Sequence, residues 1–268
     1  MQTVLKYPGS KWRIAKWIIS HFPKHHSYIE PFFGSGAVLF NKEPSAIETI
    51  NDLDHDVVNL FRCIKEDPEK IARMVDLTSY SRKEYDDSFG EAPEDKFERA
   101  VRFLVQCWQG HGFRQNGRKV GWKNDVQGRE EMYACKNWYR LPGWIMGAVD
   151  RLKQVQIECR PAIELINRFR YPNVLIYADP PYLLETRSGK QYKHEMTEQD
   201  HIELLETLLR HPGPVVISGY DNDLYNSMLT GWHMSSIGGE AEYYGKRKQQ
   251  ETIWMNFQPA AEQISLIG

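Results

Sequence analysis

The stretch "SYIEPFFGSGAVLF" at residues 27–40 decides the fold. An apolar segment, a turn with two glycines and a second apolar segment follow one another, which predicts a short strand, a tight turn and the start of a helix. Gly34 and Gly36 permit backbone angles that other residues adopt only with strain, and they let a ligand approach the main chain. Because ligands of open α/β sheets bind at the carboxyl ends of the strands, this turn is a candidate ligand-binding loop.

Strand-like and helix-like segments alternate through most of the chain. This alternation predicts an α/β fold with a doubly wound, mostly parallel sheet. Beyond the opening stretch, strands are expected within 45–54, 173–182 and 213–220, a helix within 55–67, and a strand followed by a helix within 155–169.

Two helices have predicted start signals. Residues 11–20 indicate an amphipathic helix that Ser10 would cap. Residues 197–210 indicate a helix that begins with Thr197 and Asp200 at the spacing of a capping box. The expected apolar face of this second helix consists of Ile202, Leu205, Leu208 and Leu209.

The alternation stops between about residues 60 and 145. Acidic helical stretches come first, with a net charge of −6 over residues 84–98, and a glycine-rich, basic and aromatic segment follows, with +5 over residues 100–140. We therefore expect a catalytic domain formed by 1–59 and 146–268 with an inserted domain at 60–145. The uneven charge indicates that a polyanion would contact one face of the molecule.

The overall composition is that of a folded protein outside the membrane. The net charge is −2, the mean hydropathy is −0.59, and no apolar run is long enough to span a bilayer. The first residues do not resemble a signal peptide, so we expect a cytoplasmic protein. Four widely spaced cysteines (63, 107, 135 and 159) show no metal-binding spacing, and no metal is expected.

An acid follows the glycine turn at a characteristic distance. Asp52 ends the second predicted strand, 18 residues after Gly34, where an acid usually binds ribose hydroxyls. NAD is disfavoured because Leu39 occupies the position of the third glycine of its motif, and a P-loop is disfavoured because Val4 replaces its first glycine. A nucleoside-containing cofactor of another kind is therefore expected.

The segment "DPPY" at residues 179–182 ends a predicted buried strand. Pro180 and Pro181 hold the backbone extended, so that the Asp179 carboxylate and the Pro180 carbonyl can both accept N–H groups of a planar amine that stacks on Tyr182. Two acceptors on an exocyclic amine oppose delocalisation of its lone pair into the ring. The nitrogen then becomes a better nucleophile toward a methyl sulfonium.

Four sequence blocks resemble those of the Dam-like (D12 class) DNA N6-adenine methyltransferases. They are "KYPGSK" (6–11), "EPFFGSGAV" (30–38), "NDLD" (51–54) and "DPPY" (179–182), and "SGY" (218–220) also fits a strand end of that family. The resemblance implies a Rossmann-like methyltransferase sheet with an inserted DNA-recognition domain and S-adenosylmethionine as the methyl donor. Arg160 is a departure, because the family often carries an acid there.

The resemblance also implies site residues and a substrate. Methyl transfer to N6 of a flipped-out adenine in double-stranded DNA would involve Asp179, Pro180, Pro181 and Tyr182. The implied cofactor-binding residues are Tyr7, Lys11, Phe32, Gly34, Ser35, Gly36, Asp52 and Asp179. Such an enzyme acts on DNA in a bacterial cell or a phage-infected host.

Candidate DNA-binding residues lie in the basic part of the insert. Lysines and arginines are candidates for phosphate or guanine contacts, asparagines for adenine contacts, and Trp122 for stacking or wedging between bases. The set is Arg114, Asn116, Arg118, Lys119, Trp122, Lys123, Asn124 and Arg129.

The sequence leaves other functions open. RNA adenine or a glutamine amide of a protein would fit the same acceptors, and a DNA-binding protein without catalysis would carry the same basic insert. A nicotinamide dehydrogenase is the fourth alternative. The oligomeric state is left open, with a monomer favoured.

Overall fold

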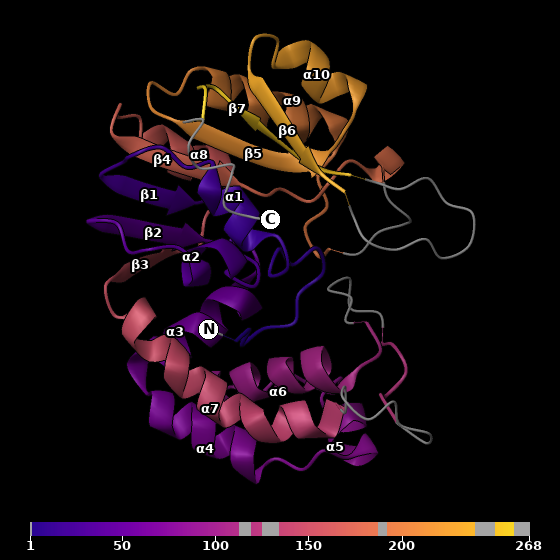
Figure 1. Cartoon of the computed structure of the whole chain (residues 1–268). Coiled ribbons are helices and arrows are strands. Elements are labelled where there is room, and N and C mark those ends of the chain that lie inside the picture. Colours follow the sequence, from indigo (N-terminus) through magenta and orange to yellow (C-terminus); the bar gives the residue numbers. More distant parts are fainter. Residues whose placement is uncertain (1, 113–118, 125–133, 187–191, 239–249, 260–268) are drawn as a thin grey trace.

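The computed structural model describes residues 2–112, 119–124, 134–186, 192–238 and 250–259. Its centre is a seven-stranded sheet with the order β3-β2-β1-β4-β5-β7-β6 (Figure 1). The five strands from β3 to β5 are parallel to one another, and β7 runs antiparallel to both β5 and β6. The strands are β1 (Ser27–Glu30), β2 (Ile47–Asn51), β3 (Val155–Glu158), β4 (Val174–Ala178), β5 (Val215–Tyr220), β6 (His233–Ile237) and β7 (Glu251–Met255).

The strand order reverses direction at β1. The chain runs outward from β1 to β2 and β3, and then returns to place β4 on the other side of β1, where Ser27 aligns with Ile47 and with Val174. The carboxyl ends of β1 and β4 therefore lie side by side at the switch point of the sheet, where ligands of such folds bind. The expected mostly parallel α/β fold is confirmed.

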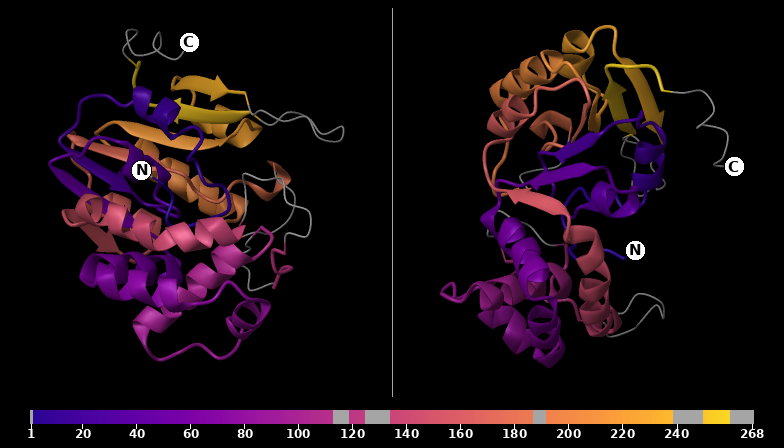
Figure 2. Two further views of the ribbon diagram at one scale, coloured as in Figure 1. Left: turned by 60° about the horizontal axis from the view of Figure 1, so that its bottom comes forward. Right: turned by 90° about the vertical axis from the view of Figure 1, so that its left-hand side faces the viewer.

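Helices cover both faces of this sheet (Figure 2). Successive residues of β1 face opposite sides: Tyr28 joins a core with α1 (Ala15–Ser20) and α2 (Ala37–Asn41), and Ile29 joins a second core with α8 and α9. The helices of the second face are α8 (Ala162–Arg168), α9 (Glu198–Leu209) and α10 (Asp223–Met228). This alternation is the reason that the sheet can be wound on both sides.

The helix expected at residues 11–20 is shorter than predicted. It begins at Ala15, after a turn, and Ser10 does not cap it. The Ser10 hydroxyl instead shares a hydrogen bond with Ser35 Oγ at 2.8 Å. The expected cap was wrong because the segment before α1 packs against the glycine turn.

The start of α9 was predicted correctly, and its buried face was predicted in part. Thr197 and Asp200 form the capping box. Leu204, Leu205 and Leu208 are buried, whereas Leu209 is 45% exposed. The packing of α9 on α8 and the sheet selects a face rotated from the one that the sequence indicated.

Five helices gather beyond the β3 edge of the sheet (Figure 1). They are α3 (His55–Glu66), α4 (Pro68–Leu77), α5 (Arg82–Asp87), α6 (Lys96–Gln109) and α7 (Ala134–Leu152), with α4 packed on α7 and α3 on α6. The expected limits of the insert, 60 and 145, fall inside α3 and α7 and remain predictions. In the described part of the chain, no helix has the length and apolar character needed to cross a membrane.

A buried charge cluster joins this helical group to the sheet. Glu48 of β2 accepts hydrogen bonds from Lys42 Nζ at 2.6 Å and from Arg151 Nη2 at 2.8 Å, and it also pairs with Arg151 Nη1. Arg151 Nε donates to the Leu39 carbonyl of α2 at 3.2 Å. The end of α7 is thereby fixed to the strand and helix beside the glycine turn.

Candidate active site

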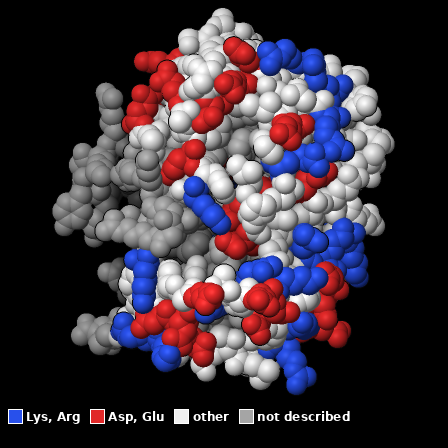
Figure 3. Space-filling view, turned by 180° about the vertical axis from the view of Figure 1, so that it is seen from behind, with Lys and Arg blue, Asp and Glu red and all other residues white. Residues whose placement is uncertain are grey.

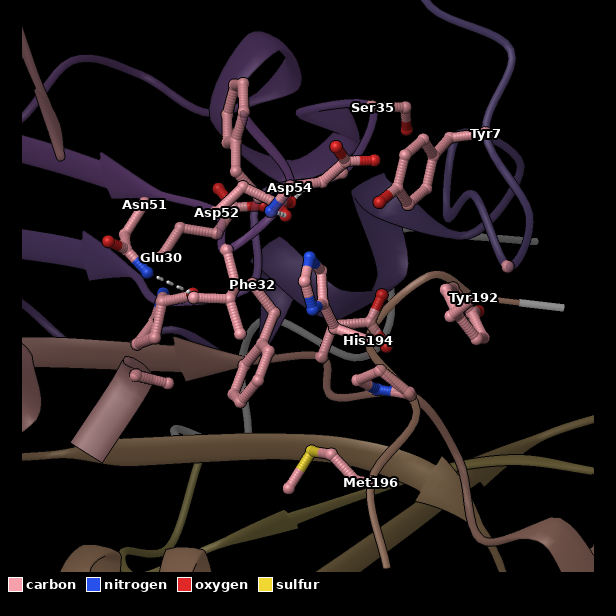
Figure 4. A pocket seen from close by; sticks show the side chains of 18 of the residues that line it. Tyr7, Glu30, Phe32, Ser35, Asn51, Asp52, Asp54, Tyr192, His194 and Met196 are labelled. Atoms are coloured by element: carbon pink, nitrogen blue, oxygen red, sulfur yellow. Dashed lines mark hydrogen bonds between the residues drawn. The ribbon is translucent and has the colours of Figure 1, made fainter. Parts of the chain in front are cut away.

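A cavity of about 270 Å³ lies at the carboxyl ends of β1, β2 and β4. Segments far apart in the sequence form its wall (Figure 4). They are the N-terminal turn at 7–11, the strand end and glycine turn at 30–35, the acidic segment at 51–54, residues 160–163, Asp179 and Pro181, and residues 192–196. The structure thus brings the expected glycine turn, Asp52 and Asp179 together.

The two glycines of the turn have different reasons for being glycine. Gly34 has φ +50°, and a Cβ there would lie 3.0 Å from Cδ1 of Tyr7, which packs against it. Gly36 has φ +68°, and a Cβ there would lie 2.3 Å from Cζ of Phe33. Gly34 therefore lets an aromatic ring approach the cavity wall, while Gly36 lets α2 start tightly against the core.

Asp52 faces the turn from the end of β2. Its carboxylate accepts the N–H of Gly34 at 2.8 Å and the N–H of Asp54 at 2.9 Å. Burial raises the pKa of Asp52 to about 7, although these backbone hydrogen bonds act in the opposite direction. The position suits a carboxylate that binds hydroxyl groups in the cavity.

Asn51 is a residue of the site that the sequence did not single out. Its side-chain nitrogen donates to the carbonyls of Pro31 at 2.9 Å and Arg160 at 3.0 Å, and its oxygen accepts the N–H of Arg160 at 3.0 Å. One buried amide therefore holds the chain ends that follow β1 and β3. Its position directly before Asp52 was the available signal.

Arg160 contributes to the cavity wall, but its charge is engaged. Its guanidinium donates to Glu158 Oε2 at 3.0 and 2.8 Å. The acid on this strand is thus Glu158, two residues before the position where the family often has one.

Glu30 is a second functional candidate that was missed. It is 2% exposed, lines the cavity, and accepts the Tyr28 hydroxyl at 2.9 Å. Burial raises the pKa of Glu30 to about 8, although the Tyr28 hydrogen bond lowers it. A carboxyl so deeply buried at a cavity wall is typical of a functional site.

Asp179 is held by two partners from distant segments. Ser218 Oγ donates to its Oδ1 at 2.7 Å, and Lys11 Nζ lies 3.0 Å from its Oδ2. Burial opposes the charge of Lys11, but the Asp179 and Glu251 carboxylates outweigh it and raise the pKa of Lys11. The carboxylate orientation is therefore fixed before any ligand binds.

The rest of the 179–182 segment is divided between the cavity and the core. Pro181 lines the cavity beside Asp179, whereas Pro180 and Tyr182 are buried next to them. The Tyr182 hydroxyl donates to Glu251 Oε2 at 2.7 Å, and Lys11 Nζ lies 4.7 Å from the centre of its ring. The tyrosine is thus linked to the ion pair of Lys11 with Asp179.

Residues 192–196 contribute Tyr192, His194 and Met196 to the wall of the cavity (Figure 4). The Tyr192 ring centre is 6.3 Å from that of Tyr7, and its hydroxyl donates to the Pro8 carbonyl at 3.4 Å. Lys193 Nζ lies 3.5 Å from Asp54 and 3.3 Å from Asp56. This segment had no signal in the sequence other than its place before a helix cap.

The structure describes four of the eight expected DNA-binding residues. Lys119 pairs with Asp86 at 2.7 Å, and the Trp122 indole donates to Gln109 Oε1 at 3.3 Å. The Trp122 ring also packs 5.5 Å from that of Tyr80, so it holds its own segment in place, and its expected stacking on DNA remains a prediction. Lys123 is half-buried and Asn124 is exposed. Arg114, Asn116, Arg118 and Arg129 lie outside the described residues.

The helical group does not present one sign of charge on every face. On the face seen in Figure 3, basic and acidic side chains are intermingled over its lower, helical part. A phosphate-binding surface would therefore have to be local, as the expected basic segment is.

Comparisons with known proteins cover nearly the whole chain. The chain is 26% identical to the type II methyltransferase M.MjaIII of Methanocaldococcus jannaschii, over 87% of this chain and 89% of that protein. It is 30% identical to the retron Ec67 DNA adenine methylase of Escherichia coli, over 85% and 80% respectively, and 25% identical to a DNA adenine methylase of Salmonella typhi, over 95% of each.

A family model matches residues 7–244, a range that includes the glycine turn, Asp52, Asp179 and the helical group. The expected resemblance is thus confirmed over most of the sequence. The chain belongs to the D12 class N6 adenine-specific DNA methyltransferases.

Proposed function

We propose that this cavity transfers a methyl group from S-adenosylmethionine to N6 of an adenine in double-stranded DNA, with Asp179 as the residue that binds the amine. One observation carries the assignment of residues. Asp179, Asp52 and the turn at Gly34 line one cavity at the switch point of the sheet. A cofactor loop and an amine acceptor on opposite rims would have been incompatible with this chemistry.

The cavity wall fits the cofactor that the family uses. All of the expected cofactor-binding residues except Gly36 line the cavity, and Gly36 shapes the turn from behind. Asp52 would bind ribose hydroxyls, and the close approach of Tyr7 to Gly34 leaves an aromatic wall beside them. S-adenosylmethionine supplies the electrophilic methyl group when it is bound.

The residues around Asp179 prepare it as an acceptor. Ser218 uses one acceptor site on Oδ1 of Asp179, and Lys11 uses one on Oδ2. A carboxylate has about four acceptor sites in all. Asp179 can therefore accept an N–H of the adenine amine without losing its own support. This contact keeps the lone pair of the amine out of the ring and available for attack.

Access to the amine requires that the adenine leave the duplex, at a cost of a few kcal/mol. We propose that the helical group from α3 to α7, with the basic segment that includes Lys119 and Lys123, binds the duplex beside the cavity. Phosphate contacts from this segment would offset part of the cost.

The test is transfer of labelled methyl from S-adenosylmethionine to mixed-sequence duplex DNA. We expect wild type to label the duplex in preference to RNA or a glutamine-containing protein, and Asp179→Asn to reduce labelling by about 1,000-fold, in the range of losses seen for essential catalytic contacts. Asp150→Asn, a surface carboxylate with 93% exposure, is the matched control and keeps activity. Wild type that labels no duplex DNA would overturn the proposal.

A further inference from the structure

Glu251 is the first residue of β7 and comes from a segment 69 residues beyond Tyr182. The antiparallel pairing of β5 with β7 aligns it with Tyr220. This register brings a carboxylate next to the aromatic residue that follows the two prolines, in a strand whose other residues are all buried.

Three contacts fix the plane of the Tyr182 ring. Its hydroxyl donates to Glu251 Oε2 at 2.7 Å, and its ring meets that of Tyr220 edge to face, with centres 4.7 Å apart and planes at 76°. Lys11 Nζ lies 4.7 Å from the ring centre. Because the hydroxyl is held at one end and the ring at the other, the side chain cannot rotate without breaking a charge-assisted hydrogen bond.

The same lysine connects this ring to the amine acceptor. Lys11 Nζ is 3.0 Å from Asp179 Oδ2 while it lies over the Tyr182 ring. A rotation of the ring would therefore displace the lysine that orients the Asp179 carboxylate. Glu251 stands at the far end of this chain of contacts.

We propose that Glu251 is a positioning residue for the target base. It holds the Tyr182 ring in the plane on which the extruded adenine stacks, and it thereby sets the direction of the amine toward Asp179. This inference rests on the proposed function and assigns to it a residue beyond the 179–182 segment. Glu251 acts through Tyr182 and takes no proton from the substrate.

The test compares Glu251→Ala, Tyr182→Phe and the double variant, once long-read sequencing of wild-type-methylated DNA has given the site. A duplex with adenine at the target position measures kcat, and a second duplex with 2-aminopurine in its place, which has no N6 amine to methylate, reports the extrusion and stacking of the base. Tyr182→Phe keeps the ring and removes the hydroxyl, so it isolates the contact to Glu251. We expect each single variant to lower kcat by about 10- to 100-fold, as misplacement of a substrate does. Both single variants should also alter the stacking of the extruded base to the same extent, which an equal change in 2-aminopurine fluorescence would show.

Non-additivity is the decisive result. If Glu251 acts through the Tyr182 hydroxyl, the double variant loses no more activity than either single variant. Glu251→Gln, which keeps an acceptor, restores most of the activity, and Glu206→Ala on the exposed face of α9 behaves as wild type.

Two outcomes overturn the inference. Full activity and unaltered fluorescence of Glu251→Ala would show that the contact is dispensable, and multiplied losses in the double variant would show that the two residues act independently. If Glu251→Ala does not fold, Tyr182→Phe and Glu251→Gln are compared instead. Loss of activity in Tyr182→Phe with most activity kept in Glu251→Gln supports the inference, and full activity in Tyr182→Phe overturns it. If wild type itself did not methylate duplex DNA, that result would instead contradict the proposed function.

Discussion

At the scale of single residues, Asp52 shows how the fold tunes a carboxyl group. Burial raises its pKa to about 7, so that a proton is lost near neutral pH. Since ribose hydroxyls donate to the ionised form, we expect cofactor affinity to rise with pH up to about 7, by as much as about tenfold for each pH unit below it. Calorimetric titration of S-adenosylmethionine between pH 5.5 and 8.5 measures this dependence.

The control separates Asp52 from the other titrating groups. Asp52→Asn removes one ionisation and should flatten the rise in affinity below pH 7, whereas Glu30→Gln should keep that rise, because the pKa of Glu30 is raised to about 8 and this group ionises above that range. Parallel pH profiles for wild type and Asp52→Asn would refute the assignment.

Ser218 gives a second prediction at this scale. Its hydroxyl donates to Asp179 Oδ1 at 2.7 Å, and hydrogen bonds to charged groups contribute about 1.5–3 kcal/mol. We expect Ser218→Ala to lower kcat by about 10- to 100-fold with little change in cofactor affinity. Steady-state kinetics on duplex DNA measure kcat, and Ser227→Ala, at an exposed serine, is the control. An unchanged kcat would remove Ser218 from the site.

Sequence reasoning found the residues whose signal is local. Gly34, Asp52 and Asp179 each stand at a recognisable place at a strand end, and the structure puts all three in one cavity wall. Glu30 was missed because only the folded sheet buries it at a cavity wall, and Glu251 was missed because its proposed role depends on Tyr182, 69 residues away.

At the scale of elements, the turn between β1 and α2 is tightly constrained. An alanine in place of Gly36 would have to adopt the left-handed backbone conformation, with φ +68°. Its methyl group would also clash with the Phe33 and Phe40 rings. Gly112 has a similar φ of +66° with nothing within 4 Å, so it isolates the backbone effect.

We expect Gly112→Ala to lower the free energy of unfolding by about 1–2 kcal/mol. Gly36→Ala should lower it by a further 1–3 kcal/mol or so, because the added methyl group overpacks the core. Urea unfolding followed by circular dichroism measures both. Equal losses would show that the rings move aside at little cost.

The elements also show where sequence patterns fail. The capping box of α9 was predicted correctly because it consists of neighbouring residues. The start of α1 was wrong, and the buried face of α9 was right at Leu205 and Leu208 but not at Leu209, because packing against the glycine turn and against α8 decides them. Tertiary contacts override local preference at both places.

At the scale of the whole molecule, Glu48 links the helical group to the sheet. Burial acts against its charge, but hydrogen bonds from Arg151 and Lys42 prevail and lower the pKa of Glu48. A lowered pKa of an acid adds stability above its unfolded pKa, and this stability is lost as the pH falls through the folded value. The link should therefore weaken below about pH 4.5.

We expect Glu48→Gln to lower the free energy of unfolding at pH 7 by about 3–5 kcal/mol, because Lys42 and Arg151 would keep buried charges without a counter-ion. Chemical denaturation measures it. Glu66→Gln is the matched control, since the Glu66–Lys96 pair is about half-exposed and such pairs contribute about 1 kcal/mol or less. A similar small effect at both positions would contradict the role of Glu48.

The fold class was predictable from the sequence because alternating strands and helices allow few arrangements. The strand order, with its switch point at β1 and β4, was not among the expectations from the sequence. The way in which the helical group is attached was not predictable, since Arg151 and Glu48 are 103 residues apart and neither belongs to a motif.

The place of β7 in the sheet has a consequence for biosynthesis. This strand lies between β5 and β6, although the ribosome makes it after both of them. Until residue 255 has left the exit tunnel, one edge of β5 is bare and Tyr182 lacks its carboxylate partner. A nascent chain therefore exposes an unpaired strand edge until β7 is complete, and we expect chaperones to bind the chain mostly during that period of translation.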